Sequence, residues 1–257
     1  MSDVEYRKDG HVAHVRLNRP DALNAISPAM DHALFEAWKD VNADHDVWVA
    51  ILSAKGERAF CAGADVRAEA NGARDRVGFG GGLTGVGGPL LKLRKPLVAA
   101  VQGHVVGGGL ELALCADFIV AADTVKLSMP ETRVGIIGES GIMHRAIRQL
   151  PYRVAMAMIL TGERLGAEQA LAHGLVNELV AFEELAEAAE RWAAKVCACS
   201  PLAVQAAKDA VLSRFDWPLD IALATRYEPI EAFAFSEDRL EGQHALAEKR
   251  EANWRGR

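Results

Sequence analysis

Short apolar segments alternate with helical patterns along the first half of the chain, and this alternation constrains the fold more than any other feature. Residues 47–52 (VWVAIL) and 96–101 (PLVAAV) are apolar throughout, as in strands that are covered on both faces. Ser27 and Pro28 are the residue types preferred at a helix N-cap and at the first helical position. We therefore expect a helix from there to about residue 43, within an α/β fold whose sheet is largely buried.

The second half of the sequence is almost entirely helical in pattern from about residue 138 onward. A fresh helix start at Ser200-Pro201 marks a boundary within this half. We expect residues 1–200 to form the core of the fold and residues 201–257 to form a helical C-terminal region. At 257 residues the chain can bury a sufficient core without disulfides.

Charge and cysteine content narrow the functional class. The formal net charge is −6 and no cluster of Lys and Arg stands out, which argues against a nucleic-acid partner. The longest apolar stretch carries Glu111, Asp117 and Asp123, so it does not resemble a membrane span. The N-terminal residues lack a signal-peptide pattern, and the four cysteines form neither a disulfide framework nor a metal-binding pattern. We expect a cytoplasmic protein that binds no metal and no membrane.

Glu111 lies in the most apolar part of the chain, directly after three glycines. An ionised carboxylate in such surroundings is costly unless it is paired or hydrogen-bonded. Either this side chain points out of a half-exposed helix, or it is a carboxyl group whose proton affinity is tuned in a dry site. The helix start after the glycines offers free N–H groups to negative charge. The segment does not match the G-x-G-x-x-G pattern, which argues against a nicotinamide dehydrogenase.

Two other segments are uninformative when each is taken alone. Glu131 follows Met129-Pro130 after an apolar segment and would be an ordinary loop residue, yet two carboxylates in one pocket allow one to act as base and the other as acid. Residues 60–65 (FCAGAD) are small enough for a ligand to lie against bare backbone, or they form a turn without function.

Taken together, the segments FCAGAD, VVGGGLELAL at residues 105–114 and Pro130-Glu131 resemble the enoyl-CoA hydratase/isomerase family, the crotonase superfamily. The similarity extends over nearly the whole chain. It implies a crotonase-like ββα spiral core over residues 1–200, with residues 201–257 as a helical region that mediates trimer formation. It also implies a homotrimer, or a homohexamer built as a dimer of trimers.

The resemblance further implies the roles of individual residues. Family members bind an acyl-CoA with the thioester oxygen between two backbone N–H groups, and the matching positions are Ala64 and Gly108. Hydratases of the family use two glutamates, which match Glu111 and Glu131; one activates water while the pair moves the α-proton. Coenzyme A is then part of the substrate thioester, and no permanently bound cofactor is implied. The CoA side of the pocket would be lined by Ala62, Asp65, Val66 and Arg67.

The sequence departs from typical hydratases of the family at Glu139, where these enzymes usually have Gly near the attacking water. Dienoyl-CoA isomerases and carnitinyl-CoA dehydratase-like members carry an acid at the matching position. Glu139 is either a surface carboxylate at the start of the next helix, where an acid suits the helix dipole, or a third acid in the pocket. In the pocket it would bind a polar or cationic acyl group or act as an isomerase base.

The leading hypothesis is therefore a hydro-lyase of fatty acid metabolism that hydrates a 2-enoyl-CoA through an enolate, including a carnitinyl-CoA type of dehydratase. Within the family, the alternative is a double-bond isomerase with Glu131 and Glu139 as bases. From another class, the alternative is a non-catalytic acyl-CoA-binding protein. The presence of both glutamates argues against this last hypothesis.

Overall fold

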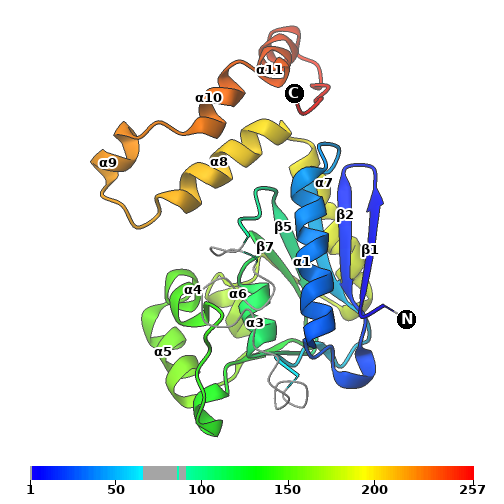
Figure 1. Ribbon diagram of the computed structural model, residues 1–257, viewed down its shortest axis with the longest axis vertical. Coiled ribbons are helices and arrows are strands. Elements are labelled where there is room, and N and C mark those ends of the chain that lie inside the picture. The colour runs from blue at the N-terminus through cyan, green and yellow to red at the C-terminus, as the bar shows by residue number, and fades with distance from the viewer. Residues whose placement is uncertain (1, 66–85, 87–90) are drawn as a thin grey trace.

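The computed structural model describes residues 2–65, 86 and 91–257, which form two sheets surrounded by helices (Figure 1). The first sheet has the order β1 (Val4–Asp9), β2 (Val12–Leu17), β3 (Val49–Ala54), β5 (Leu97–Val101), β7 (Phe118–Ala122), β10 (Glu178–Val180). The second has the order β4 (Ala59–Cys61), β6 (His104–Val106), β8 (Lys126–Ser128), β9 (Leu165–Gly166). The helices are α1 (Pro28–Ala43), α3 (Gly108–Ala113), α4 (Ile142–Gln149), α5 (Tyr152–Thr161), α6 (Ala167–Ala172), α7 (Leu185–Cys197), α8 (Pro201–Ser213), α9 (Leu219–Ala224), α10 (Glu228–Ala234) and α11 (Glu237–Glu248).

The first sheet is covered on both faces, which explains its wholly apolar strands. From β2 to β10 its strands are parallel, and β1 joins the edge as an antiparallel strand. On β3, Ala50 and Leu52 belong to the core that includes α1, whereas Val49 and Ile51 pack with α7 on the opposite face. The expected α/β fold with a buried sheet is thus confirmed.

The first long helix begins where the sequence predicts. The hydroxyl oxygen of Ser27 accepts a hydrogen bond from the N–H of Met30 at 3.1 Å, and Pro28 is the first helical residue. The helix ends at Ala43 and buries Met30, Leu34, Ala37, Trp38 and Val41. Sequence and structure agree here because capping and apolar spacing act within one element.

Five strands are not predicted from the sequence: β1, β4, β6, β9 and β10. The strands β9 and β10 interrupt the second half, which was expected to be almost entirely helical. Strands of two and three residues are too short to reveal an alternating pattern, and β10 is only half-buried at the sheet edge. These strands form because neighbouring strands offer free backbone groups.

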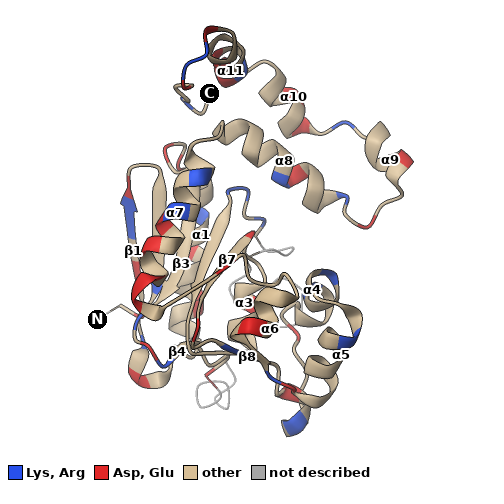
Figure 2. Ribbon diagram, turned by 180° about the vertical axis from the view of Figure 1, so that it is seen from behind, with Lys and Arg blue, Asp and Glu red and all other residues tan. Residues whose placement is uncertain are grey.

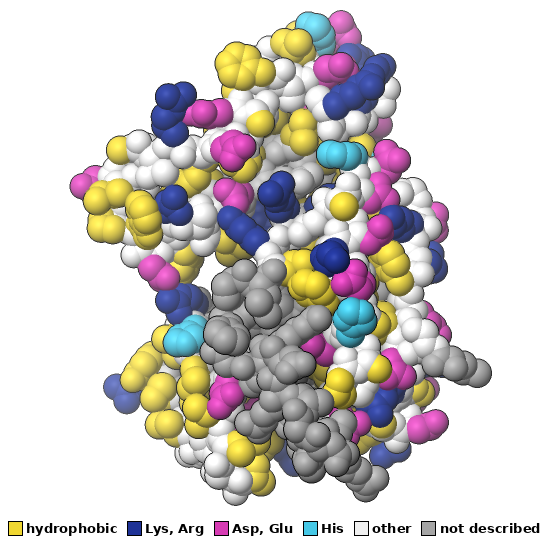
Figure 3. Space-filling view, viewed as in Figure 1, with side chains coloured by type: hydrophobic (Ala, Val, Ile, Leu, Met, Phe, Trp, Pro, Cys, Tyr) yellow, Lys and Arg dark blue, Asp and Glu magenta, His cyan; other side chains and the backbone are white. Residues whose placement is uncertain are grey.

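The helices after residue 200 extend from the rest of the molecule as an arm (Figure 1). Large apolar side chains lie exposed on it, and hydrophobic surface is visible there in Figure 3. The most exposed are Leu219, Leu223, Phe235 and Leu246. Basic and acidic residues are interspersed along the ribbon rather than gathered by sign (Figure 2). Within the described ranges, no helix combines the length and apolarity needed to cross a bilayer.

Candidate active site

The second sheet brings the three informative sequence segments together. Its strands β4, β6 and β8 are parallel neighbours, so their carboxyl ends meet at one edge. The end of β4 leads into Ala62–Ala64, β6 leads into the three glycines, and β8 leads into Pro130-Glu131. Parts of all three segments line one cavity of about 430 Å³.

The two residues whose backbone N–H groups the sequence singles out, Ala64 and Gly108, both line this cavity. A Cβ on Gly63 would lie 3.3 Å from the nitrogen of Gly108, and one on Gly109 would lie 2.4 Å from the carbonyl oxygen of Cys61, so the two segments are in close contact. Neither N–H has a hydrogen-bond acceptor among the residues that the structure describes. Both are free to bind a negatively charged oxygen.

Glu111 is a buried carboxylate held by two backbone donors. It lies in α3 with 3% of its surface exposed. Its Oε1 accepts hydrogen bonds from the N–H of Ser140 at 2.9 Å and the N–H of Ile142 at 3.3 Å. Burial raises the pKa of Glu111 to about 7, the two N–H groups oppose this rise, and the charge of Glu131 adds to it. The exposed-helix interpretation of Glu111 is therefore wrong.

Glu131 lines the same cavity but has fewer hydrogen-bond partners than Glu111. Its side chain lies against Gly107, where an added Cβ would come within 2.6 Å of Oε1. Its Oε2 is buried and has no hydrogen-bond partner within the described ranges. Burial raises the pKa of this carboxyl group as well. Two desolvated carboxyl groups with raised pKa values can divide the roles of acid and base near neutral pH.

Exposed apolar side chains form one wall of the cavity. Val134, Ile136 and Ile137 are exposed by 72%, 49% and 55%, and they follow Glu131 in the chain. Glu139 lies beyond them on the same wall, is exposed, and has no ion-pair or hydrogen-bond partner in the described part of the chain. The cavity therefore combines an apolar wall with an unpaired acid at its solvent side.

The remaining predicted residues divide into three groups. Ala62 lines the cavity, as expected. Asp65 is not among its lining residues: its carboxylate pairs with Arg19 at 3.0 Å and its N–H donates to the carbonyl of Ile26. Val66 and Arg67 lie outside the described residues.

Sequence reasoning missed the donors that hold Glu111. Ser140 and Ile142 contribute backbone N–H groups, which any residue carries, so no side-chain pattern announces them. A signal exists in Gly138, since a Cβ there would lie 3.2 Å from Oε1 of Glu111 and 2.3 Å from the Ile142 side chain. A glycine before the turn is thus required for the close approach.

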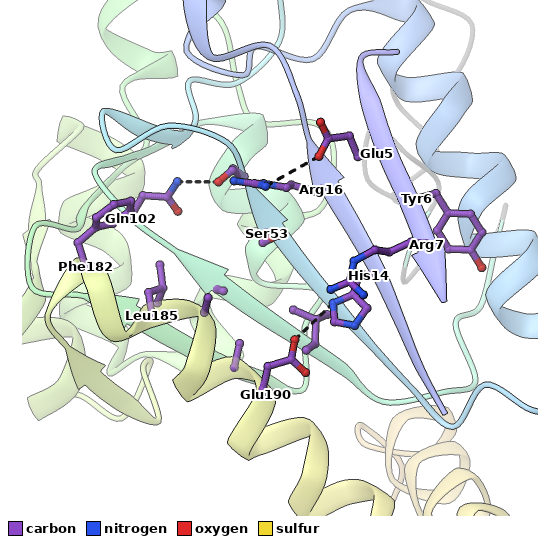
Figure 4. A pocket seen from close by; sticks show the side chains of 15 residues that line it. Glu5, Tyr6, Arg7, His14, Arg16, Ser53, Gln102, Phe182, Leu185 and Glu190 are labelled. Atoms are coloured by element: carbon purple, nitrogen blue, oxygen red, sulfur yellow. Dashed lines mark hydrogen bonds and ion pairs between the residues drawn. The ribbon is translucent and has the colours of Figure 1, made fainter. Parts of the chain in front are cut away.

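A second cavity, of about 320 Å³, lies on the α7 face of the first sheet (Figure 4). His14 and Glu190 approach within 3.5 Å there, and the amide nitrogen of Gln102 donates to the carbonyl oxygens of Ala54 and Gly56. None of the three informative segments lines it among the described residues. The carboxylate cavity is therefore the candidate active site.

Comparisons with known proteins agree with this geometry. The family model described as enoyl-CoA hydratase/isomerase matches residues 7–257. The (E)-benzylidenesuccinyl-CoA hydratase of Thauera aromatica is 37% identical, covering 98% of this chain and 99% of that one. The carnitinyl-CoA dehydratase of Salmonella typhimurium is 38% identical and covers 97% of each. A crystal structure from Novosphingobium aromaticivorans, provisionally named a short chain enoyl-CoA hydratase, is 59% identical with a TM-score of 0.92, covering 100% of this chain and 99% of that one.

Proposed function

The chain belongs to the enoyl-CoA hydratase/isomerase family, and on that premise we propose that it is an enoyl-CoA hydratase, a hydro-lyase that adds water reversibly to a 2-enoyl-CoA. One observation carries the proposal: Glu111, which is buried, and Glu131, which is half-buried, have raised pKa values and line the same cavity as two unpaired N–H groups. The relatives named as a hydratase and a dehydratase of CoA thioesters support it.

The N–H groups of Ala64 and Gly108 would bind the thioester oxygen. Addition of a nucleophile to the β-carbon moves an electron pair onto this oxygen and forms an enolate. Donors fixed in advance stabilise that charge, and loss of one such donor typically costs on the order of 10²–10³ in rate. Glycines at positions 63 and 109 support this role because they let the two segments approach closely.

The two carboxyl groups would divide the proton transfers. Glu111 is suited to be the base because two N–H donors stabilise its ionised form, and a pKa of about 7 keeps it reactive near neutral pH. It would take a proton from water as the water oxygen bonds to the β-carbon. Glu131 is half-buried, has one buried oxygen without a described partner and has a raised pKa, so it would be the acid and would give its proton to the α-carbon. Proton exchange with solvent then restores both groups.

The test is hydration of crotonyl-CoA, followed by loss of the enone absorbance, in Glu111→Gln and Glu131→Gln variants. Each should lose on the order of 10²–10⁴ in kcat while it retains CoA-ester binding. Glu168→Gln, a change in the first turn of α6, is the control and should keep wild-type activity. Full activity in both variants would refute the mechanism, and binding without turnover in the wild type would support a non-catalytic acyl-CoA-binding protein.

We propose Glu139 as a third acid that selects the acyl group. Its exposure, its lack of a partner and its place beside the apolar wall support contact with a polar or cationic acyl substituent. Glu139→Gly should then shift the preference toward plain straight-chain enoyl-CoAs, measured as kcat/KM over an acyl panel. Unchanged relative rates would count against it. Double-bond isomerisation with Glu131 and Glu139 as bases is the alternative, and heavy-oxygen water distinguishes it because isomerisation incorporates no label.

The arm after residue 200 would mediate assembly into a homotrimer, or into a homohexamer as a dimer of trimers. Its exposed apolar side chains support this role because such surface is costly in water. Light scattering coupled to size-exclusion chromatography measures the oligomeric state directly, and a monomer would refute the proposal.

Asp65, Val66 and Arg67 would lie on the CoA side of the pocket. The four unpaired cysteines support a cytoplasmic location.

A further inference from the structure

The turn before α4 fixes the position of the buried carboxylate Glu111. Both donors to its Oε1, the N–H groups of Ser140 and Ile142, come from this turn. The residue between them, Gly141, has a φ of +113° and is the N-cap of α4. A change in this turn would therefore move both donors together.

The guanidinium group of Arg145 contacts this turn. Nη1 of Arg145 donates to the carbonyl oxygen of Ser140 at 3.1 Å. An added Cβ on Gly141 would come within 1.9 Å of that Nη1 and 3.0 Å of Cζ, so the guanidinium lies directly against Gly141. The N–H of Arg145 also donates to the carbonyl of Gly141 at 2.9 Å. Side chain and backbone of one residue thus bind two consecutive carbonyl groups of the turn.

Arg145 is not among the residues that line the carboxylate cavity. It lines a neighbouring cavity of about 580 Å³, together with Cys115 and Gln149. The Sγ of Cys115 in turn contacts the carbonyl oxygen of Glu111 at 3.3 Å, so this neighbouring cavity lies behind the helix that carries the carboxylate. The described contacts that connect Arg145 to the carboxylate of Glu111 therefore run through the turn.

We propose that Arg145 is a positioning residue for Glu111: its guanidinium fixes the turn at Ser140 and Gly141 and so keeps two N–H groups directed at the carboxylate. This proposal rests on the proposed hydratase function in giving Glu111 the role of base. The hydrogen bonds stabilise the ionised carboxylate against burial. Loosening the turn would weaken them, and a higher pH would be needed to ionise the base.

The experiment compares Arg145→Met with Arg148→Met. Arg148 is the matched control because it lies on the same helix and loses the same charge, while its guanidinium binds Asp216 at 2.9 Å and the carbonyl of His144 at 2.7 Å. In crotonyl-CoA hydration, Arg145→Met should lower kcat on the order of 10-fold with little change in KM. The acidic limb of kcat/KM should move up by about one pH unit, the order expected when a hydrogen bond to a charged group is lost. Arg148→Met should leave both unchanged.

Arg145→Lys supplies a second variant if the methionine variant does not fold. An ammonium can donate one hydrogen bond to the carbonyl of Ser140, so the acidic limb should lie between those of wild type and Arg145→Met. If only Arg145→Lys folds, the acidic limb of its kcat/KM profile should lie at a higher pH than that of the wild type. The proposal would be overturned if the acidic limb of kcat/KM lay at the wild-type pH in every folded Arg145 variant. It would also be overturned if Arg148→Met shifted this limb by the same amount.

Crystal structures of the same variants separate this inference from the proposed function. In Arg145→Met the distance from the N–H nitrogen of Ser140 to Oε1 of Glu111 should increase beyond 2.9 Å, with no change in Arg148→Met. A wild type that hydrates no enoyl-CoA would refute the hydratase, yet this distance would still test the positioning role. An unchanged distance would overturn the positioning role even in an active hydratase.

Discussion

A single methyl group added at Gly107 tests the geometry of the carboxylates. Gly107 has φ +53° and ψ −121°, a combination that suits glycine, and it is the N-cap of α3. A Cβ there would lie 2.6 Å from Oε1 of Glu131, whereas ordinary contacts begin at 3.4 Å. The carboxylate must therefore move by about 0.8 Å, and a misplacement near 1 Å costs on the order of 10² in rate, or about 2.7 kcal/mol.

Gly10 provides the matched control for the backbone strain that alanine brings at a positive φ. It has the same φ of +53°, in the turn between β1 and β2, and an added Cβ would have nothing within 4 Å. A side chain at positive φ costs about 1–2 kcal/mol. Both Gly107→Ala and Gly10→Ala should therefore lower the free energy of unfolding, but only the first should displace a carboxylate.

The assay measures kcat for crotonyl-CoA hydration, CoA-ester affinity by calorimetry, and the free energy of unfolding in urea. Gly107→Ala should lose on the order of 10² in kcat and keep its affinity within a few fold. Gly10→Ala should keep wild-type kcat. The reasoning is refuted if Gly107→Ala retains wild-type kcat, or if Gly10→Ala loses as much activity as Gly107→Ala.

Two further predictions concern stability. The pKa of Glu111 is about 7 in the fold against 4.5 as an ordinary value, so the folded state retains a proton that the unfolded chain releases, and stability falls as the pH rises from about 4.5 to 7. Glu111→Gln removes the loss of stability that comes from ionising Glu111, so at pH 8 the variant should be more stable than wild type by up to about 3 kcal/mol. Urea unfolding at pH 5 and pH 8 measures this difference, and an equal pH dependence of the two proteins would contradict the prediction. Asp238 is 1% exposed and accepts hydrogen bonds from the N–H groups of Arg255 and Gly256 at 2.8 and 3.2 Å, so Asp238→Ala should cost about 2–4 kcal/mol. The exposed Asp220→Ala is its control, and equal melting temperatures would refute the role of the buried carboxylate.

Sequence reasoning succeeded where the determining information is local or is carried by a motif. The N-cap Ser27 and the apolar segments define their own elements, so α1, β3 and β5 follow from neighbouring residues alone. The gathering of Ala64, Gly108 and Glu111 with Glu131 needed the family resemblance, because parallel pairing of β4, β6 and β8 joins segments that are distant along the chain.

The features that the sequence does not predict depend on backbone groups or on pairing between residues that are distant along the chain. The expectation for Asp65 rests on its position in a motif, and the motif does not predict that its carboxylate pairs with Arg19, which is 46 residues earlier in the chain. The C-terminal residues are similarly fixed by distant partners, since the indole N–H of Trp254 donates to the carbonyl of Ala198. Pairings of this kind depend on the complete fold and leave no periodic pattern.

The asymmetry between the two carboxylates is the feature that argues most directly for a division of labour. Two acids with equal surroundings would compete for one proton and would exchange roles freely. Here Oε1 of Glu111 is held by two N–H donors, while Oε2 of Glu131 is buried without a described partner. The two donors favour the charged form of Glu111 and partly offset its burial, whereas the burial of Glu131 is not offset in this way and favours its neutral form. A pocket whose two carboxyl groups both have raised pKa values can take a proton from water with the one that is ionised and supply a proton to carbon from the other.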